Sequence, residues 1–377
     1  MKKILSFLIF TLAAANLFGA VKKVQETSTP ASDSRITYVG RHLANEEGVS
    51  FDWSGVYAKI RFEGNYIAIK ASDTQKNYYN VWIDKDASSA PDKIISIFGK
   101  DSLITLFDEA YFKSVKNTKG TDVHRLIIQK RTEGHQGRTT IHSFITKGRI
   151  LEAEGPKERI IEFIGDSYTC GYGTENSIRT DPFKAETENS NLSYAPIVAR
   201  YFDADYILIA HSGMGISRNY NEGEKGHYMP DKYLQTFDID ETVKWDAKSS
   251  NLKPQITVIY LGTNDFSTNR QPTLRNFKEN YIRLLKSIKE NYGKDHPILC
   301  VGSKMDEMLY DYLRDIVRIC GLSQVSYMVL SERIHNIDSE LGASWHPNYK
   351  GHIKKAYAMI PYISTMTGWD MSEKPVK

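Results

Sequence analysis

The chain has 377 residues, and at ~150 residues per domain this length predicts two to three structural units. Hydrophobic residues make up 41% of it and charged residues 25%, which is an ordinary globular composition, and 49 lysines and arginines against 46 acids leave a formal charge of +3. So small a surplus argues against a nucleic-acid-binding protein, and three cysteines without zinc-site spacing argue against a disulfide scaffold or a zinc finger.

The N-terminus has the three parts of a secretory signal peptide. Lys2 and Lys3 give a basic start, residues 4–15 form an apolar run, and small residues lead up to Ala20. We therefore expect residues 1–20 to be a signal peptide with cleavage near Ala20. An uncleaved anchor is the alternative, but the apolar run is short, and no later segment reaches the ~18 apolar residues of a span. The mature protein is expected to be secreted or periplasmic, without stable membrane insertion.

The next two segments differ in composition. Residues 21–34 are polar, with little to bury, and predict a tether. Residues 35–150 hold short alternating runs, rich in β-branched and aromatic residues and separated by turn residues, with no helical periodicity. This pattern is typical of an antiparallel, jelly-roll-like β-sandwich domain. The expected strands are 56–62, 66–70, 79–83, 93–97, 124–128 and 140–144.

A charged segment, residues 148–159, contains Gly155-Pro156 and marks the connection to a second domain, residues 151–377. In this domain, apolar runs of strand length alternate with helical patterns. The alternation predicts a parallel sheet covered by helices on both faces, an α/β/α domain with its ligands at the carboxyl ends of the strands. The expected strands are 160–164, 206–210, 256–261, 298–301 and 325–330, and the expected helices are 193–202, 273–292 and 308–320.

The first expected strand of this domain ends in Gly165-Asp166-Ser167. A serine directly after a strand can present its hydroxyl and its backbone N–H to the same point, as a nucleophile with oxyanion stabilisation requires. On its own this tripeptide is a weak signal, because it describes a turn or a helix cap equally well.

Three further clusters of polar and glycine residues have related positions. Gly213 and Asn264 each follow an expected strand, where a backbone N–H and a side-chain amide can donate to an oxyanion. His346 stands before the C-terminal helical pattern, where it can act as a base for Ser167. Each of these residues alone is more often a turn, cap or packing residue, and none of the ten histidines has the spacing of a metal-binding set.

Together, Ser167, Gly213, Asn264 and His346 resemble the four blocks of the SGNH (GDSL-type) hydrolase superfamily, in the same chain order. The local sequences resemble carbohydrate esterase family 2 more narrowly, and this resemblance runs from about residue 35 to the C-terminus. The runs that carry it are GDSYTCGYG at 165–173, SGMGI at 212–216, MPD at 229–231, LGTND at 261–265 and, in the β-half, KRTE at 130–133.

The resemblance implies an esterase that removes acetyl groups from sugar hydroxyls. Ser167 is then expected to be the nucleophile and His346 the base, and the oxyanion is expected to bind the amides of Ser167 and Gly213 and the side chain of Asn264. This chemistry needs no metal or organic cofactor. The expected partner is an acetylated carbohydrate, with no role for nucleic acid.

One departure from the family pattern concerns the acid that orients the histidine. The superfamily has an aspartate three residues before the histidine, where this chain has Ala343, and some family members have an acid two residues before it, where this chain has Ser344. We therefore expect a Ser–His dyad, with a backbone carbonyl or Ser344 orienting the imidazole. A contribution from Asp338 or Glu340 through a loop excursion is the alternative.

The remaining expectations concern neighbours of the clusters and competing functions. Trp345 is expected to provide a stacking face for sugar rings, although packing is an alternative, whereas His211 and Asp265 are expected to be structural or to support the site. Cys170 is expected to be a small buried thiol. Two functions compete with the acetyl esterase: an SGNH lipase or acyltransferase with another acyl donor, and a glycan-binding protein whose esterase site has decayed.

Overall fold

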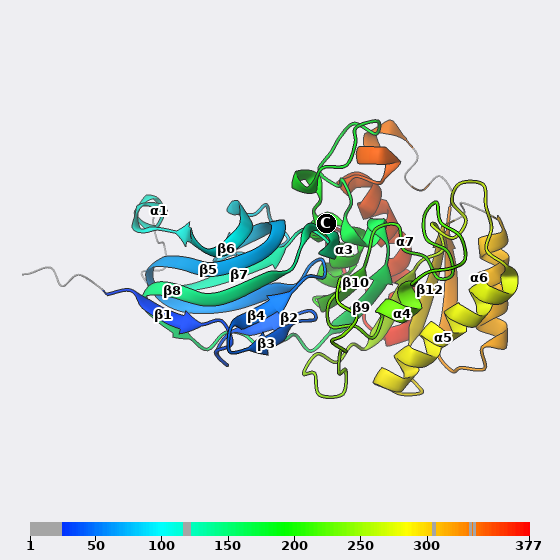
Figure 1. Ribbon diagram of the computed structural model, residues 1–377, viewed down its shortest axis with the longest axis horizontal. Coiled ribbons are helices and arrows are strands. Elements are labelled where there is room, and N and C mark those ends of the chain that lie inside the picture. Colours follow the sequence, from blue (N-terminus) through cyan, green and yellow to red (C-terminus); the bar gives the residue numbers. More distant parts are fainter. Residues whose placement is uncertain (1–24, 116–121, 304–306, 332–333, 335–336) are drawn as a thin grey trace, which may run out of the picture.

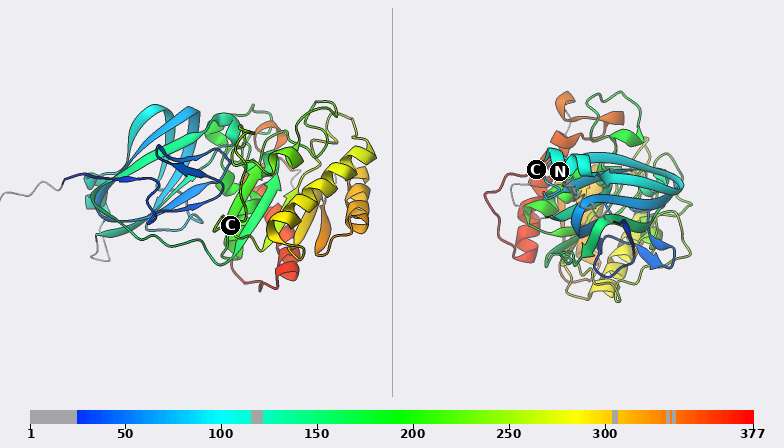
Figure 2. Two further views of the ribbon diagram at one scale, coloured as in Figure 1. Left: turned by 60° about the horizontal axis from the view of Figure 1, so that its bottom comes forward. Right: turned by 90° about the vertical axis from the view of Figure 1, so that its left-hand side faces the viewer.

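The computed structural model describes residues 25–115, 122–303, 307–331, 334 and 337–377. The predicted signal peptide, residues 1–20, lies outside these ranges. Two bodies lie side by side along the long axis, a β-domain from the N-terminal part of the chain and an α/β domain from the C-terminal part (Figures 1 and 2). Among the described helices, none is both long enough and apolar enough to cross a membrane.

The β-domain contains β1 (Thr27–Pro30), β2 (Thr37–Val39), β3 (Leu43–Asn45), β4 (Gly48–Phe51), β5 (Tyr57–Ile83), β6 (Lys93–Phe107), α1 (Glu109–Ser114), β7 (Val123–Lys130), the short helix η1 (Gly134–Gln136) and β8 (Thr139–Leu151). All its strand pairs are antiparallel. The long strand β5 pairs with β7 through residues 57–63 and again through 79–83, and it pairs with β8 through residues 61–64 and 67–73. Bulges bend β5 between these parts. This one long strand thus pairs with β2, β6, β7 and β8 and links most of the antiparallel sheet.

Three details differ from the expectations. Thr27–Pro30, inside the predicted tether, forms β1 and pairs with β8, because backbone pairing at a sheet edge does not require apolar side chains. The runs expected as separate strands at 56–62, 66–70 and 79–83 fall almost entirely within β5. The expectation of no helix in this half is wrong, because Asp108 caps the six-residue helix α1. Six residues are too few for periodicity to predict a helix.

The α/β domain contains β9 (Ile160–Gly165), α2 (Ser167–Cys170), η2 (Ala185–Thr187), η3 (Ser190–Leu192), α3 (Tyr194–Tyr201), β10 (Asp205–Ala210), α4 (Met229–Lys232), β11 (Ile256–Tyr260), α5 (Leu274–Tyr292), β12 (Ile298–Ser303), α6 (Glu307–Ile319), β13 (Val325–Leu330), η4 (Asp338–Glu340), η5 (Ala343–Trp345) and α7 (Tyr349–Thr367). Its strands lie in the order β10-β9-β11-β12-β13, and every pair is parallel. This arrangement confirms the predicted parallel sheet.

Helices cover both faces of this sheet. On β9, the ring of Phe163 contacts Tyr194 of α3 with a centroid distance of 5.9 Å, whereas the neighbouring Glu162 accepts a hydrogen bond of 2.9 Å from Tyr292 of α5. Successive residues of a strand point to opposite faces. Helices α3 and α5 therefore lie on opposite sides of the sheet, as the sequence pattern predicts.

The helix α5 shows why the pattern predicts these elements well. Its residues Phe277, Tyr281, Leu284, Leu285 and Ile288 recur at helical spacing and are all buried. The hydroxyl of Thr273 accepts a hydrogen bond from the backbone N–H of Asn276 and so caps the first turn, while Gly293 follows the last residue. Periodicity and capping thus agree in position, and the helix forms within one residue of the expected range.

The two domains share a polar interface and a continuous apolar core. The indole N–H of Trp53 donates to the backbone oxygen of Thr236 at 3.0 Å. On β10, Asp205 accepts a hydrogen bond of 2.6 Å from the hydroxyl of Tyr57 and forms an ion pair of 2.8 Å with Lys59, both from β5. These contacts connect the β-domain to the edge strand of the parallel sheet.

A fully buried ion pair also crosses the interface. Arg41, in the loop after β2, places its guanidinium 3.5 Å from the carboxylate of Glu162 in the middle of β9, and neither side chain is exposed. Arg41 also donates to the backbone oxygens of Tyr233 and Gln235, and its guanidinium lies over the ring of Tyr233. Burial raises the pKa of Glu162. The positive charge of Arg41 and the hydroxyl groups that donate hydrogen bonds to the carboxylate act in the opposite direction and stabilise its charged form.

We expect Arg41→Met to destabilise the protein by about 3–5 kcal/mol, because the change leaves Glu162 buried without its cation. Urea denaturation followed by circular dichroism measures the difference. Arg149→Met is the matched control, since Arg149 forms an ion pair with Glu63 in which both side chains are exposed, and its loss is expected to cost less than about 1 kcal/mol. Equal effects of the two changes would contradict the importance of the buried pair.

Candidate active site

Ser167 lies at the carboxyl end of β9, where the chain enters the short helix α2. The side chain of Asp166 caps this helix by accepting a hydrogen bond of 3.1 Å from the backbone N–H of Tyr168. Ser167 is the first residue of the helix, so its own backbone N–H is not used within the helix. Of the two roles that the sequence left open, the helix cap belongs to Asp166, which leaves the hydroxyl of Ser167 free of the capping role.

The structure brings Ser167 and His346 together although 179 residues separate them. The hydroxyl oxygen of Ser167 lies 2.9 Å from Nε2 of His346, and Nδ1 of His346 lies 3.0 Å from the backbone oxygen of Ser344. A carbonyl oxygen can only accept, so Nδ1 carries the proton and Nε2 is free to accept the proton of Ser167. This is the tautomer that a base for Ser167 requires.

A tight turn aims the Ser344 carbonyl at the ring. Ser344 has φ 51° and ψ 41°, and Trp345 has φ 60°, so two successive residues with side chains occupy the left-handed region. Residues other than glycine pay a conformational cost in this region, and such backbone clusters at functional sites. The turn returns the Ser344 oxygen to the imidazole two residues later.

Neither carboxylate considered as an alternative orients His346. Asp338 forms an ion pair of 2.5 Å with Arg179, and Glu340 forms one with Lys354. At the superfamily position, the side chain of Ala343 is fully buried. Of the two orienting groups that the sequence left open, the structure has the backbone carbonyl in contact with Nδ1.

The imidazole of His346 lies between aromatic rings. It stacks on Tyr172 with a centroid distance of 4.2 Å and meets the edge of Tyr168 at 5.5 Å. This burial, with a smaller contribution from the charge of Lys355, lowers the pKa of His346 to about 4, because both disfavour the imidazolium. His346 is therefore neutral, and able to accept a proton, across the whole physiological range.

Gly213 follows β10 in a turn with φ +80°, a conformation that favours glycine. Among the described residues, none accepts a hydrogen bond from its backbone N–H. The preceding N–H, of Ser212, donates to the carboxylate of Glu133 at 2.7 Å. The turn therefore carries a backbone donor without an acceptor among the described residues, and Glu133 of the β-domain holds the turn in place.

Asn264 follows β11 and is nearly buried. Its side-chain amide donates to the carboxylate of Asp166 at 3.1 Å and to the backbone oxygen of Met214 at 2.9 Å. Both hydrogens of the amide are thus directed to protein acceptors. To stabilise an oxyanion, Asn264 has to share or release one of these hydrogen bonds when substrate binds.

The other residues singled out in the sequence have structural contacts. The carboxylate of Asp265 accepts hydrogen bonds from the backbone N–H groups of residues 216, 217 and 218 and so fixes the loop after Gly213. His211 pairs with Asp238 at 2.8 Å. Cys170 is buried, as expected. Trp345 is 57% exposed beside His346, so packing does not account for its position.

Two residues near the site were not singled out individually by sequence. Glu133 lies within the family motif at 130–133, and its carboxylate contacts both the backbone of Ser212 and the Cys170 thiol. Lys355 is fully buried on α7, donates to the hydroxyl of Tyr260 at 2.6 Å, and has a pKa lowered to about 7 by burial. The available signal was a lysine at helical spacing among apolar residues of the C-terminal helix.

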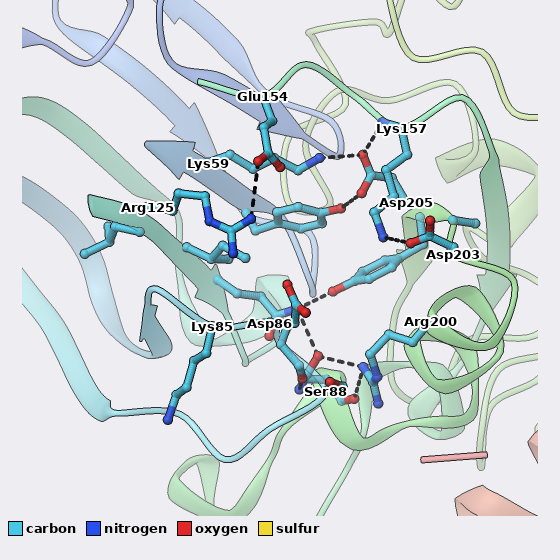
Figure 3. Close-up of a pocket in the computed structure, with 18 of the residues that line it drawn as sticks. Lys59, Lys85, Asp86, Ser88, Arg125, Glu154, Lys157, Arg200, Asp203 and Asp205 are labelled. Atoms are coloured by element: carbon cyan, nitrogen blue, oxygen red, sulfur yellow. Dashed lines mark hydrogen bonds and ion pairs between the residues drawn. The ribbon is translucent and has the colours of Figure 1, made fainter. Parts of the chain in front are cut away.

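A cavity of about 680 Å³ lies elsewhere, between the domains, and is lined by residues of β5, β7, β10 and α3 (Figure 3). Ser167, Gly213, Asn264 and His346 are not among the described residues that line it. Lys59 and Asp205, which line it, form an ion pair across the domain interface. The chemistry of the Ser167–His346 pair is therefore separate from this cavity.

Two family models match the chain in succession. The model described as carbohydrate esterase 2 N-terminal matches residues 38–153, and the model described as GDSL-like lipase/acylhydrolase matches residues 161–359. The second match covers the strands and loops that carry Ser167, Gly213, Asn264 and His346. Both matches agree with the resemblance that the sequence motifs indicate.

Individual proteins are similar over most of the chain. It is 30% identical over 355 residues to the cellulase/esterase CelE of Acetivibrio thermocellus, a match covering 92% of this chain and 41% of that protein. It is 28% identical to an acetylxylan esterase/glucomannan deacetylase of Cellvibrio japonicus, with 85% of this chain and 86% of the relative covered. A solved family two carbohydrate esterase from Clostridium thermocellum, in complex with cellohexaose, superposes with a TM-score of 0.78 at 30% identity, covering 89% of this chain and 100% of that one.

An NMR titration of the histidines tests the surroundings of His346. We expect its imidazole to become half protonated at about pH 4, well below the ~6.5 of a free histidine, because the ring is buried. The unfolded chain takes up this proton near pH 6.5, so His346 makes the fold less stable as the pH falls from about 6.5 to about 4. The spectrum of His346→Gln assigns the signal, and a value at or above 6.5 would contradict the expectation.

Proposed function

The chain belongs to the GDSL-like lipases/acylhydrolases and, within them, to family 2 of the carbohydrate esterases, and on this premise we propose that it removes acetyl groups from sugar hydroxyls. The observation that carries the proposal is the 2.9 Å contact between the hydroxyl of Ser167 and Nε2 of His346. The chain spans 41% of CelE, so its own activity is inferred from the part that the two proteins share.

In the proposed mechanism, Ser167 attacks the carbonyl carbon of the acetyl ester while Nε2 of His346 takes the hydroxyl proton. The tetrahedral oxyanion is stabilised by the backbone N–H groups of Ser167 and Gly213 and by the amide of Asn264. The C–O bond to the sugar then breaks, and His346 returns the proton to the leaving sugar hydroxyl. Water, deprotonated by His346, then attacks the acetyl carbon, the bond to the Ser167 oxygen breaks as His346 returns the proton to it, and acetate and free Ser167 are released.

The pair works as a dyad in this proposal. The Ser344 carbonyl holds the same tautomer that a carboxylate holds in a triad, so geometry and proton position are retained. A neutral carbonyl gives less stabilisation to the imidazolium than a carboxylate does. The pKa of His346 is low, so its imidazolium is a strong acid and passes its proton on readily to the leaving group.

The substrate class follows from the relatives and from Trp345. The Cellvibrio japonicus relative is named an acetylxylan esterase and glucomannan deacetylase, and the solved relative holds cellohexaose. Exposed aromatic rings can bury the apolar faces of sugars, and Trp345 has 57% of its surface free beside His346. We propose an acetylated polysaccharide or oligosaccharide as substrate, and secretion to the periplasm or the outside of the cell by the predicted signal peptide.

Glycan binding without hydrolysis is a second candidate. Exposed Trp345 and the cellohexaose in the solved relative both favour a surface that retains sugars. The contact between Ser167 and His346 argues for hydrolysis in addition, because binding alone requires no such pair.

Acetate release from acetylated xylan, acetylated glucomannan and simple acetyl sugars tests the proposed activity. We expect Ser167→Ala to lower the rate on the order of 10⁴-fold or more, because the nucleophile is lost. Chromogenic esters of increasing acyl length separate an acetyl esterase from a lipase or acyltransferase, and acetyl is expected to be preferred. If the native chain and Ser167→Ala were equally inert while glycan binding persisted, the binding function would be correct and the esterase proposal wrong.

Ala343→Asp tests whether the dyad is complete. The side chain of Ala343 is fully buried and packs against Gly173, so a carboxylate there loses its hydration and is expected to destabilise the fold without raising activity. Denaturation and kcat/KM are measured together. Ala343→Asn is the matched control, because it adds the same volume without the charge. A sharp rise in activity of Ala343→Asp with unchanged folding would mean that the native site lacks its acid.

A further inference from the structure

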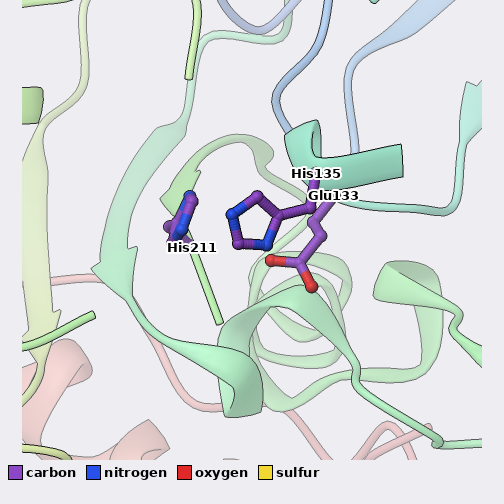
Figure 4. A group of neighbouring side chains, drawn as sticks. All are labelled: Glu133, His135 and His211. Atoms are coloured by element: carbon purple, nitrogen blue, oxygen red, sulfur yellow. The ribbon is translucent and has the colours of Figure 1, made fainter. Parts of the chain in front are cut away.

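A group of potential metal ligands lies beside the site but outside the proposed mechanism. Glu133, His135 and His211 each direct one carboxylate oxygen or ring nitrogen into a common space, with these atoms all within 4.8 Å of one another (Figure 4). In the β-domain, Glu133 directly precedes η1 and His135 lies within it, whereas His211 follows β10 of the α/β domain. We propose that these three side chains form a binding site for a divalent transition-metal ion of the zinc class.

His211 is oriented as metal-binding histidines are. Its Nδ1 lies 2.8 Å from both carboxylate oxygens of Asp238, which is completely buried. A histidine that donates one nitrogen to a carboxylate presents the other to a metal with its tautomer and ring position fixed. Among the described residues, Nε2 of His211 has no hydrogen-bond partner, so this nitrogen is available.

The other two ligands meet His211 in defined positions. The rings of His135 and His211 stand edge to face with a centroid distance of 4.0 Å. Glu133 is almost fully buried, and its carboxylate is held by the backbone N–H of Ser212. Gly134 allows this approach, since a Cβ there would lie 2.4 Å from the carboxylate of Asp238. The ligands are thus positioned before any ion binds, which limits the entropy lost on binding.

The donor set decides the class of ion. Two imidazoles and one carboxylate suit zinc and neighbouring transition metals, whereas calcium and magnesium prefer oxygen ligands alone. Three protein ligands leave a position for water, as in open zinc sites. His135 is exposed to solvent, so an ion has a path to the site.

A bound ion would join the two domains next to the oxyanion turn. His211 immediately precedes Ser212 and Gly213, and Glu133 already contacts the backbone of Ser212. The ion would add coordination bonds between these parts, so it is expected to stabilise the folded state in proportion to its affinity. The site does not rest on the esterase proposal, because Ser167 and His346 take no part in it.

Isothermal titration of the chelator-treated full chain with Zn²⁺ tests the site. We expect one ion per chain. Loss of a residue that only hydrogen-bonds to a metal ligand lowers metal affinity by ~10–100-fold, so His135→Gln, which removes a ligand itself, is expected to weaken binding by more than this. Because His135 is exposed, this variant is expected to fold. His227→Gln is the matched control, an exposed histidine 3.0 Å from the carboxylate of Glu241, and it is expected to bind as the native chain does. Zn²⁺ is also expected to raise the Tm of the native chain and of His227→Gln, but not of His135→Gln.

Co²⁺ provides a second readout, because its absorption spectrum reports nitrogen and oxygen ligands in low-coordinate geometry and is expected to disappear in His135→Gln. Absence of saturable binding would overturn the proposal, as would equal affinity of the native chain and His135→Gln. Binding retained in His135→Gln but lost in Cys170→Ala would also overturn it, because the ion would then lie deeper, between Glu133, Cys170 and Glu188.

Discussion

The hydrogen bond between Nδ1 of His346 and the backbone oxygen of Ser344 is the interaction on which the site depends. It fixes the tautomer that lets Nε2 face Ser167, and it does so without a charged partner. Burial against Tyr172 then keeps the ring neutral, since nothing nearby favours the imidazolium strongly enough to offset desolvation. Two left-handed residues in succession are the conformational cost of this turn, and the surrounding packing holds them there.

The β-domain takes part in the architecture of the site rather than serving as a separate module. Arg41 enters the α/β domain and pairs with Glu162 on the central strand, and Glu133 holds the turn that contains Gly213. The first contact is a fully buried ion pair in which each charge offsets the desolvation of the other, and the second is a hydrogen bond from a backbone N–H to a carboxylate. Separating the domains would therefore leave Glu162 without its buried cation and the turn at Gly213 without the hydrogen bond from Ser212 to Glu133.

Local patterns in the sequence predict most of the fold. Apolar periodicity predicts the five parallel strands and α5 closely, because these elements bury a continuous stripe or run. It fails for the six-residue helix α1 and for β1, where capping and backbone pairing decide the structure instead. The bends that make β5 one strand are likewise invisible, because a bulge depends on the partner strand as much as on the bulged residues.

The sequence by itself determines which residue types stand at the strand ends, and it thereby indicates Ser167, Gly213 and His346 as candidates. It also shows that position 343 is not an aspartate. Only the tertiary structure decides that a backbone carbonyl faces His346, and that His211 lies against His135, 76 positions earlier in the chain. The reason is physical. Side-chain identity and spacing encode local conformation, whereas carbonyl direction and contacts between domains arise only when the packed core fixes the backbone.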